Sequence, residues 1–133
     1  MIDNSDFVRS LYEAFGRGDV QTILDNVDPA IEWVSNGNHE TIPWGGKRDG
    51  EAGVASFFQA LGDNLDFEMF EQHQFCDAGN VVTVLGRSRA QFKTGGRGIF
   101  DSDWAHIFTI EGGQLTRFQE FYDTAAIEQA RSV

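Results

Sequence analysis

Cysteine and positive charge are scarce in this sequence of 133 residues. The single cysteine, Cys76, excludes an intrachain disulfide and a multi-cysteine metal cluster, and it suits a cytoplasmic address. Ten basic residues stand against 21 acidic ones, and this formal net charge of −11 argues against nucleic acid or an anionic membrane as a partner. No apolar run approaches the ~20 residues of a membrane span. The N-terminus also lacks the basic start and apolar core of a signal peptide.

The composition is that of one globular domain over residues 1–133. Hydrophobic residues make up 41% of the chain and charged residues 23%, which excludes a disordered protein. A chain of this length can bury a core that needs neither disulfides nor a structural metal. Fifteen glycines against two prolines indicate many short turns.

Helical spacing of apolar residues dominates the first half of the chain. It predicts a helix over residues 5–16, a short second helix that Asp19 caps and that Asp28-Pro29 stops, and a third helix over residues 51–64. Asp123 is a good cap for a further short helix at the C-terminus.

Alternation typical of β-strands dominates the second half. The predicted strands span residues 30–35, 67–76, 81–92, 98–110 and 115–122. The order of elements predicts an α+β fold with three helices on one face of a strongly curved antiparallel sheet. Both faces of the strands carry large apolar residues. The sheet is therefore covered on both sides, curled around a cavity, or paired with another subunit.

Six segments in the same order span nearly the whole chain and carry a family resemblance: residues 12–19, 29–33, 43–50, 54–58, 79–86 and 113–123. Together they resemble the nuclear transport factor 2-like (NTF2-like) superfamily, and within it the bacterial SnoaL-like group, which is related to ketosteroid isomerase. The resemblance implies a cone-shaped fold with a deep pocket between helices and curved sheet, commonly in a homodimer. Fold alone does not assign chemistry, because this scaffold hosts isomerases, hydrolases, cyclases and non-enzymes.

Ketosteroid isomerase chemistry is not matched at the corresponding positions. That enzyme uses an aspartate as the base, and a tyrosine and a protonated aspartic acid donate hydrogen bonds to the oxyanion. The positions of tyrosine, base and acid fall here on Leu11, Trp33 and His106. Tyr12 is adjacent, but helical geometry turns it about 100° away. The sequence therefore argues against ordinary ketosteroid isomerisation.

Two further chemistries of the superfamily leave one acidic position to consider. Limonene epoxide hydrolase uses an Asp-Arg-Asp set, and the resemblance places Leu85 and Arg87 where its arginine and one aspartate should lie. Two of the three groups are therefore not matched, which argues against this chemistry, and only the third position, Glu120, is acidic here. SnoaL-type polyketide cyclases use one acidic residue near the end of the last strand to remove a proton. Either Glu120 or Asp123 matches that position.

The register of the last hairpin decides which side chains meet. A two-residue loop puts His106 opposite Gln119. A three-residue loop with a glycine bulge pairs Glu111 with Leu115 and puts His106 opposite Glu120. We favour the second register, because the resemblance places Glu120 on the pocket face.

This register predicts an aromatic pocket that holds an imidazole and a carboxylate. Opposed residues are within hydrogen-bonding reach, and either group can act as a base near neutral pH. The hypothesis is cofactor-free proton abstraction next to a carbonyl, or acid-base assistance to ring closure, on a flat apolar substrate. The candidate catalytic residues are His106, Glu120 and Asp123. The candidate substrate-binding residues are Trp33, Trp44, Trp104, Phe108, Phe118 and Tyr122.

Each candidate also has a purely structural interpretation. The His106–Glu120 pair can simply be a buried polar pair, and Asp123 can act only as a helix cap. Trp44 is either a lid or a packing plug. No histidine or acidic cluster has metal-ligand spacing, so no metal is expected.

The sequence leaves open the direction of two arginines and the class of function. Arg87 and Arg89 share one strand face, which points either outward, to pair with acids such as Glu71, or inward, to bind an anion. An enzyme, a ligand-binding module and a dimerisation module are all compatible with the predicted fold.

Overall fold

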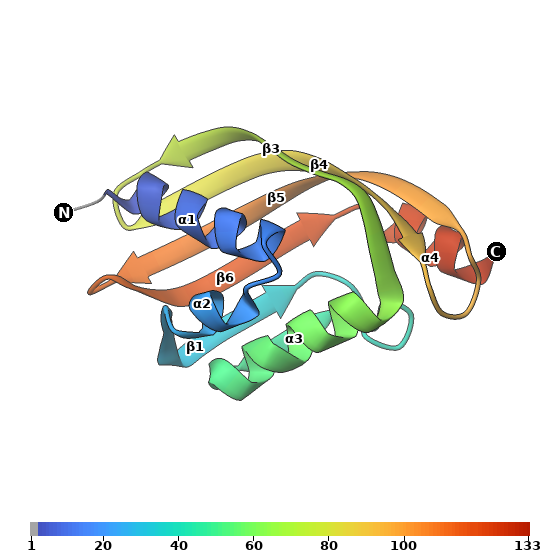
Figure 1. Ribbon diagram of the computed structural model, residues 1–133, viewed down its shortest axis with the longest axis horizontal. Coiled ribbons are helices and arrows are strands. Elements are labelled where there is room, and N and C mark those ends of the chain that lie inside the picture. The colour runs from blue at the N-terminus through green and yellow to red at the C-terminus, as the bar shows by residue number, and fades with distance from the viewer. Residues whose placement is uncertain (1–2) are drawn as a thin grey trace.

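The structure is a computed structural model, and it describes residues 3–133 of the predicted 1–133 domain; residues 1 and 2 lie outside the described part. Four helices and six strands follow one another along the chain (Figure 1). Their bounds are α1 Asn4–Gly16, α2 Val20–Leu24, β1 Val27–Ser35, β2 Gly46–Asp49, α3 Gly50–Asn64, β3 Leu65–Asp77, β4 Val81–Phe92, β5 Ile99–Glu111, β6 Gln114–Tyr122 and α4 Thr124–Ser132.

One curved sheet with the strand order β2-β1-β6-β5-β4-β3 forms the body of the molecule. Helices α1, α2 and α3 lie along one side of it, and α4 packs on β5 near the other end (Figure 1). The predicted α+β fold is therefore confirmed. None of the helices within residues 3–133 is long and apolar enough to cross a membrane.

The sheet differs from the prediction in one strand and one direction. Strand β2, with the sequence Gly-Lys-Arg-Asp, was expected to be loop because it has no apolar alternation. Strand β1 runs parallel to β6, whereas the other neighbouring strands are antiparallel. Strand β1 also starts at Val27 and includes Asp28-Pro29, so α2 is shorter than predicted.

The hairpin between β5 and β6 has the predicted pairing for a different reason. Gly112 and Gly113 form a two-residue turn, both with positive φ, so Glu111 pairs with Gln114 and the predicted three-residue loop is wrong. Further along, the consecutive β5 residues Ile110 and Thr109 pair with Leu115 and Arg117. The residue between them, Thr116, is therefore an extra residue, a β-bulge.

The bulge changes which residues face one another in the rest of the hairpin. Beyond it, His106 lies opposite Glu120, with Phe108 opposite Phe118 on the same face. Without it, the pairing set by the turn would continue and put Gln119 opposite His106. Glu120 would then point to the other side of the sheet, because strand side chains alternate between faces. One inserted residue thus brings Glu120 to the concave side.

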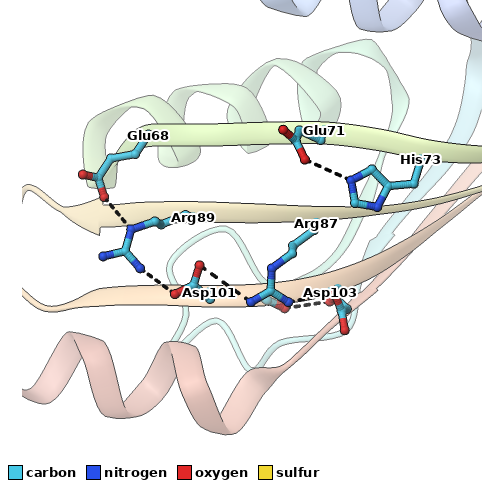
Figure 2. Close-up of polar contacts among 8 residues, drawn as sticks. Glu68, Glu71, His73, Arg87, Arg89, Asp101 and Asp103 are labelled. Atoms are coloured by element: carbon cyan, nitrogen blue, oxygen red, sulfur yellow. Dashed lines mark hydrogen bonds and ion pairs between the residues drawn. The ribbon is translucent and has the colours of Figure 1, made fainter.

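Charged side chains occupy the convex side of β3, β4 and β5, as Figure 2 shows. Arg89 contacts Asp101 at 2.6 Å and Glu68 at 3.2 Å, and Arg87 contacts Asp103 at 2.9 Å. Both arginines therefore point outward, which is one of the two directions that the sequence left open. The predicted partner Glu71 is wrong, because Glu71 contacts His73 instead (Figure 2).

Gly86 is the place where the sheet leaves no room for a side chain. A Cβ at this position would overlap the six-membered ring of Trp104 on β5 and the backbone oxygen of Glu71 on β3. Gly86 pairs with Trp104 across the two strands. Because Gly86 has no side chain, the indole of Trp104 packs directly against the backbone of β4.

We expect Gly86→Ala to lower the free energy of unfolding by about 1–3 kcal/mol, because the added methyl group overpacks the Trp104 ring and the β3 backbone. Gly62→Ala is the matched control, since nothing lies within 4 Å of a Cβ there. Removing this glycine from helix α3 should raise stability by about 0.5–1 kcal/mol. Urea unfolding measures both; equal changes would contradict the close approach.

Candidate functional site

An apolar cavity of about 100 Å³ lies between the concave face of the sheet and the helices. Its walls come from α1, α2, α3, α4 and all strands except β2, together with the loop that carries Trp44. Aromatic residues predominate among them, and the only carboxylic acid is Glu120. The lining residues are Leu11, Tyr12, Phe15, Ile23, Trp33, Trp44, Phe57, Phe58, Leu61, Leu65, Phe67, Phe70, Ser88, Phe100, Ser102, Trp104, His106, Phe108, Leu115, Phe118, Glu120, Tyr122 and Ile127.

The imidazole of His106 joins helix α1 to strand β6. Its Nε2 lies 3.3 Å from Oε2 of Glu120, and its Nδ1 lies 2.7 Å from the hydroxyl of Tyr12. His106 is 6% exposed and Glu120 is 8% exposed, so the carboxyl group and the imidazole are removed from water. The two groups therefore interact much more strongly than a surface pair does.

The second oxygen of Glu120 is held from strand β1. The hydroxyl of Ser35 donates to Oε1 of Glu120 over 2.8 Å, and it also contacts the hydroxyl of Tyr122. The backbone N–H of Gly37 donates to that same Tyr122 oxygen over 3.2 Å. We call Tyr12, His106, Glu120, Ser35 and Tyr122 the polar chain.

The partners of each group set the direction of donation in the polar chain. A neutral His106 that accepts from Tyr12 at Nδ1 carries its proton on Nε2, facing the carboxylate of Glu120. Ser35 fixes Oε1, whereas Oε2 has only the contact with His106 among residues 3–133. Oε2 is thus the oxygen that is able to accept a proton from a bound molecule.

Both phenols of the chain are held in their neutral form. Burial, and secondarily the charge of Glu120, raises the pKa of Tyr12 well above its ordinary value. Burial and then the same charge also raise the pKa of Tyr122, although hydrogen bonds with Ser35 and Gly37 oppose this shift. Both hydroxyls therefore remain donors at neutral pH.

Aromatic rings fix the orientation of the polar chain. The indole of Trp104 stacks on the His106 ring with centroids 3.9 Å apart, and the Tyr12 ring stacks on His106 at 5.9 Å and on Trp104 at 6.1 Å. On the opposite side, Trp33 stacks on Phe118 at 4.1 Å. These contacts restrict rotation of the imidazole.

Trp44 is a fixed wall of the cavity. It is 3% exposed, and its ring packs near Tyr122 and Phe92. The guanidinium of Arg48 donates to the backbone oxygens of Pro43, Trp44 and Gly45, which ties down this loop. Of the two interpretations of Trp44, the contacts favour packing over a lid.

All six predicted substrate-binding residues line the cavity, as do His106 and Glu120. Asp123 is not among the lining residues, and its catalytic role stays a prediction. Its side chain accepts from the backbone N–H of Ala126 at the start of α4 and lies exposed. No cluster of three or more histidine, cysteine or acidic residues within residues 3–133 is arranged to hold a metal ion.

Sequence reasoning missed Tyr12 and Ser35. Tyr12 was expected to point away from the pocket, but α1 is rotated about its own axis so that both Leu11 and Tyr12 line the cavity. Ser35 reaches Glu120 because β1 pairs with β6 in parallel, which places the two residues side by side. The only available signal was the alternation of Trp33 and Ser35 on one strand face.

Tyr12 and Tyr122 are the only tyrosines in the chain, so tyrosinate absorbance reports on this site alone. The pKa of both phenols is raised in the folded state, so their stabilising effect is complete below the ordinary pKa of about 10 and is lost as pH rises above it. We expect the free energy of unfolding to fall above about pH 10, and no tyrosinate to form before the protein unfolds.

An alkaline titration followed by ultraviolet absorbance and circular dichroism measures both events. Tyr122→Phe should leave Tyr12 as the single reporter and keep the same order of events. Ionisation of a phenol near pH 10 in a protein that is still folded would contradict the burial of the polar chain.

The sequence of the chain matches the model of the SnoaL-like domain over residues 8–118. No curated protein matches it significantly. An NTF2-like protein from Burkholderia xenovorans LB400 is 27% identical, with a TM-score of 0.86 over 96% of this chain and 95% of the other. An NTF2-like protein from Burkholderia thailandensis E264 is 26% identical, with a TM-score of 0.86 over 98% of each chain.

A third similar structure is that of TerC, co-crystallised with polyporic acid. It is 24% identical, with a TM-score of 0.82 over 98% of each chain, and at this identity it shows similarity of fold. The family match covers most of the chain, and the similar structures cover nearly all of it. The protein therefore belongs to the SnoaL-like family of the NTF2-like superfamily.

Proposed function

We propose that this protein catalyses proton transfer on a small apolar carbonyl compound, as an isomerase or a cyclase does. The observation that carries the proposal is the buried contact between His106 and Glu120 inside a cavity with aromatic walls. A carboxylate in such a place is costly for the fold unless it is paired. Buried titratable groups of this kind occur preferentially at functional sites.

In the proposed step, Oε2 of Glu120 takes a proton from the carbon next to the substrate carbonyl. The electron pair of the broken C–H bond forms the C=C bond of an enolate, and the negative charge moves to the carbonyl oxygen. Return of the proton to a different carbon completes an isomerisation. Attack of the enolate carbon on a second carbonyl, with the proton passing to the new alkoxide, completes a ring closure. Neither sequence needs an oxidant or a reductant, in keeping with the expectation of a cofactor-free reaction.

His106 and Tyr12 act in this proposal as positioning residues. Nδ1 of His106 is occupied by Tyr12, and Nε2 faces the carboxylate, so the ring lies against Glu120 and orients it. The aromatic walls exclude water, which strengthens each of these interactions.

The test follows exchange of the methyl protons of acetophenone in D₂O by NMR. We expect the wild-type protein to accelerate exchange, and Glu120→Gln, which keeps the shape and removes the base, to lower the rate by about 100-fold or more. Glu111→Gln makes the same chemical change at the exposed hairpin tip and should leave the rate unchanged.

His106→Ala supplies a second arm of the same experiment. It should reduce the rate less than Glu120→Gln does, because the base stays while the residue that orients it is lost. Exchange at equal rates in the wild type and in Glu120→Gln would refute proton abstraction by Glu120.

Binding of a small ligand without turnover is the second candidate function. It is favoured by the fact that Ser35 and Tyr12 already occupy both sides of the His106–Glu120 pair, as in a structural polar network. TerC, which is similar in fold, was co-crystallised with a small molecule. Saturable binding of acetophenone with no acceleration of exchange would select this function.

In either case we propose a homodimer formed through the convex face of the sheet. Leu85, Ala105 and Phe121 lie side by side across β4, β5 and β6, and Leu85 and Phe121 are about 40% exposed. The neighbouring Arg87–Asp103 pair offers both signs of charge (Figure 2). A two-fold axis through this face would therefore set apolar against apolar and each charge near its opposite.

Phe121→Asp should convert this dimer to a monomer in analytical ultracentrifugation, because a charge would be buried without a partner. Ile99→Asp is the matched control, since Ile99 is equally exposed but lies at the start of β5, away from the row. A monomeric wild type, or equal effects of the two variants, would contradict the proposed interface.

A further inference from the structure

Two of the three tryptophans carry a buried N–H group without a protein partner. Within residues 3–133, no group accepts a hydrogen bond from Nε1 of Trp33 or Nε1 of Trp104. Trp33 is 3% exposed and Trp104 is 6% exposed, so water at the protein surface does not serve them. Buried polar groups are nearly always satisfied, because an unsatisfied buried donor destabilises the fold. Two such donors in one small protein call for a physical reason.

Both indoles line the cavity that holds the polar chain. Trp104 lies two residues before His106 on the same face of β5 and stacks on its ring. Trp33 pairs with Phe118, two residues from Glu120 on the same face of β6. The two indole side chains therefore flank the His106–Glu120 pair, Trp104 from β5 and Trp33 from β1.

Carbon makes up most of the cavity wall, and the other hydroxyl groups that line it belong to Tyr12, Tyr122, Ser88 and Ser102. Phe108 and Phe118 contribute only carbon, and Glu120 repels a second negative or strongly electron-rich group. Indole N–H groups donate and do not accept. An apolar pocket with a few fixed polar groups binds apolar ligands and uses those groups to set orientation.

We propose that the indole N–H groups of Trp33 and Trp104 are specificity-determining donors that bind oxygen acceptors of a flat aromatic ketone in this cavity. The inference rests on the proposed function only in assuming that the cavity takes a small carbonyl compound. The donors fix the carbonyl, so that the carbon next to it faces the carboxylate of Glu120. As charge develops on the carbonyl oxygen, these hydrogen bonds strengthen, because charge-assisted bonds exceed neutral ones.

The test compares two probes of the same shape in the wild-type protein. Acetophenone has a carbonyl acceptor, and α-methylstyrene has a methylene group in its place. The three indole N–H signals of the ¹⁵N-labelled protein are resolved by NMR and assigned with single Trp→Phe variants. Acetophenone should shift the proton signals of Trp33 and Trp104 downfield and move that of Trp44 less. The hydrocarbon should cause no such downfield shift.

The double variant Trp33→Phe/Trp104→Phe keeps both aromatic walls and removes both donors. It should weaken acetophenone binding on the order of tenfold or more, with α-methylstyrene binding changed little. The Trp44 signal and circular dichroism report whether the variant is folded, and the wild-type shifts provide the test if it is not. Equal weakening of both probes, no change for either, or no binding of either probe to the wild type would overturn the inference.

This outcome is independent of the proposed catalysis. A carbonyl preference that depends on the tryptophans, with no proton exchange, supports the inference and refutes the enzyme. Exchange that depends on Glu120, without any tryptophan-dependent preference, supports the enzyme and refutes the inference.

Discussion

The pairing of β5 with β6 beyond the bulge at Thr116 is the constraint on which the site depends. The tight turn at Gly112-Gly113 would by itself place Glu120 on the convex face, in water. The inserted residue reverses the alternation and turns this carboxyl group inward, opposite His106. Backbone hydrogen bonds along two long strands hold the arrangement, so a single position in the sequence determines whether the cavity contains an acid.

Much of this arrangement could be predicted from the sequence, because strand alternation is a local signal. It placed Trp104 and Phe108 on one face with His106, and the SnoaL-like resemblance supplied the face of β6. The loop length was wrong and the pairing was nevertheless right, since a bulge further along has the same effect as a longer loop. The three-residue spacing between the inward-facing Leu115 and Phe118 contains this information.

Several features depend on relations between distant segments, which periodicity does not reveal. The rotation of α1 about its axis decides where Tyr12 points, and it follows from packing against the sheet. The parallel neighbour of β6 decides that Ser35 reaches Glu120. Strand β2 has too few apolar residues to stand out. The sequence suited Asp123 both to a helix cap and to a base, and the structure shows the cap.

The polar chain and its aromatic walls make one coherent site only if a ligand places its reactive carbon at Oε2 of Glu120, the oxygen that Ser35 does not hold. A crystal structure with bound acetophenone measures this directly. The account predicts the methyl carbon within about 3–3.5 Å of Oε2 of Glu120, a distance suited to reaction, with the ring between the tryptophans. A ketone bound outside the cavity, or a carboxyl group of Glu120 turned to the convex face, would contradict the account.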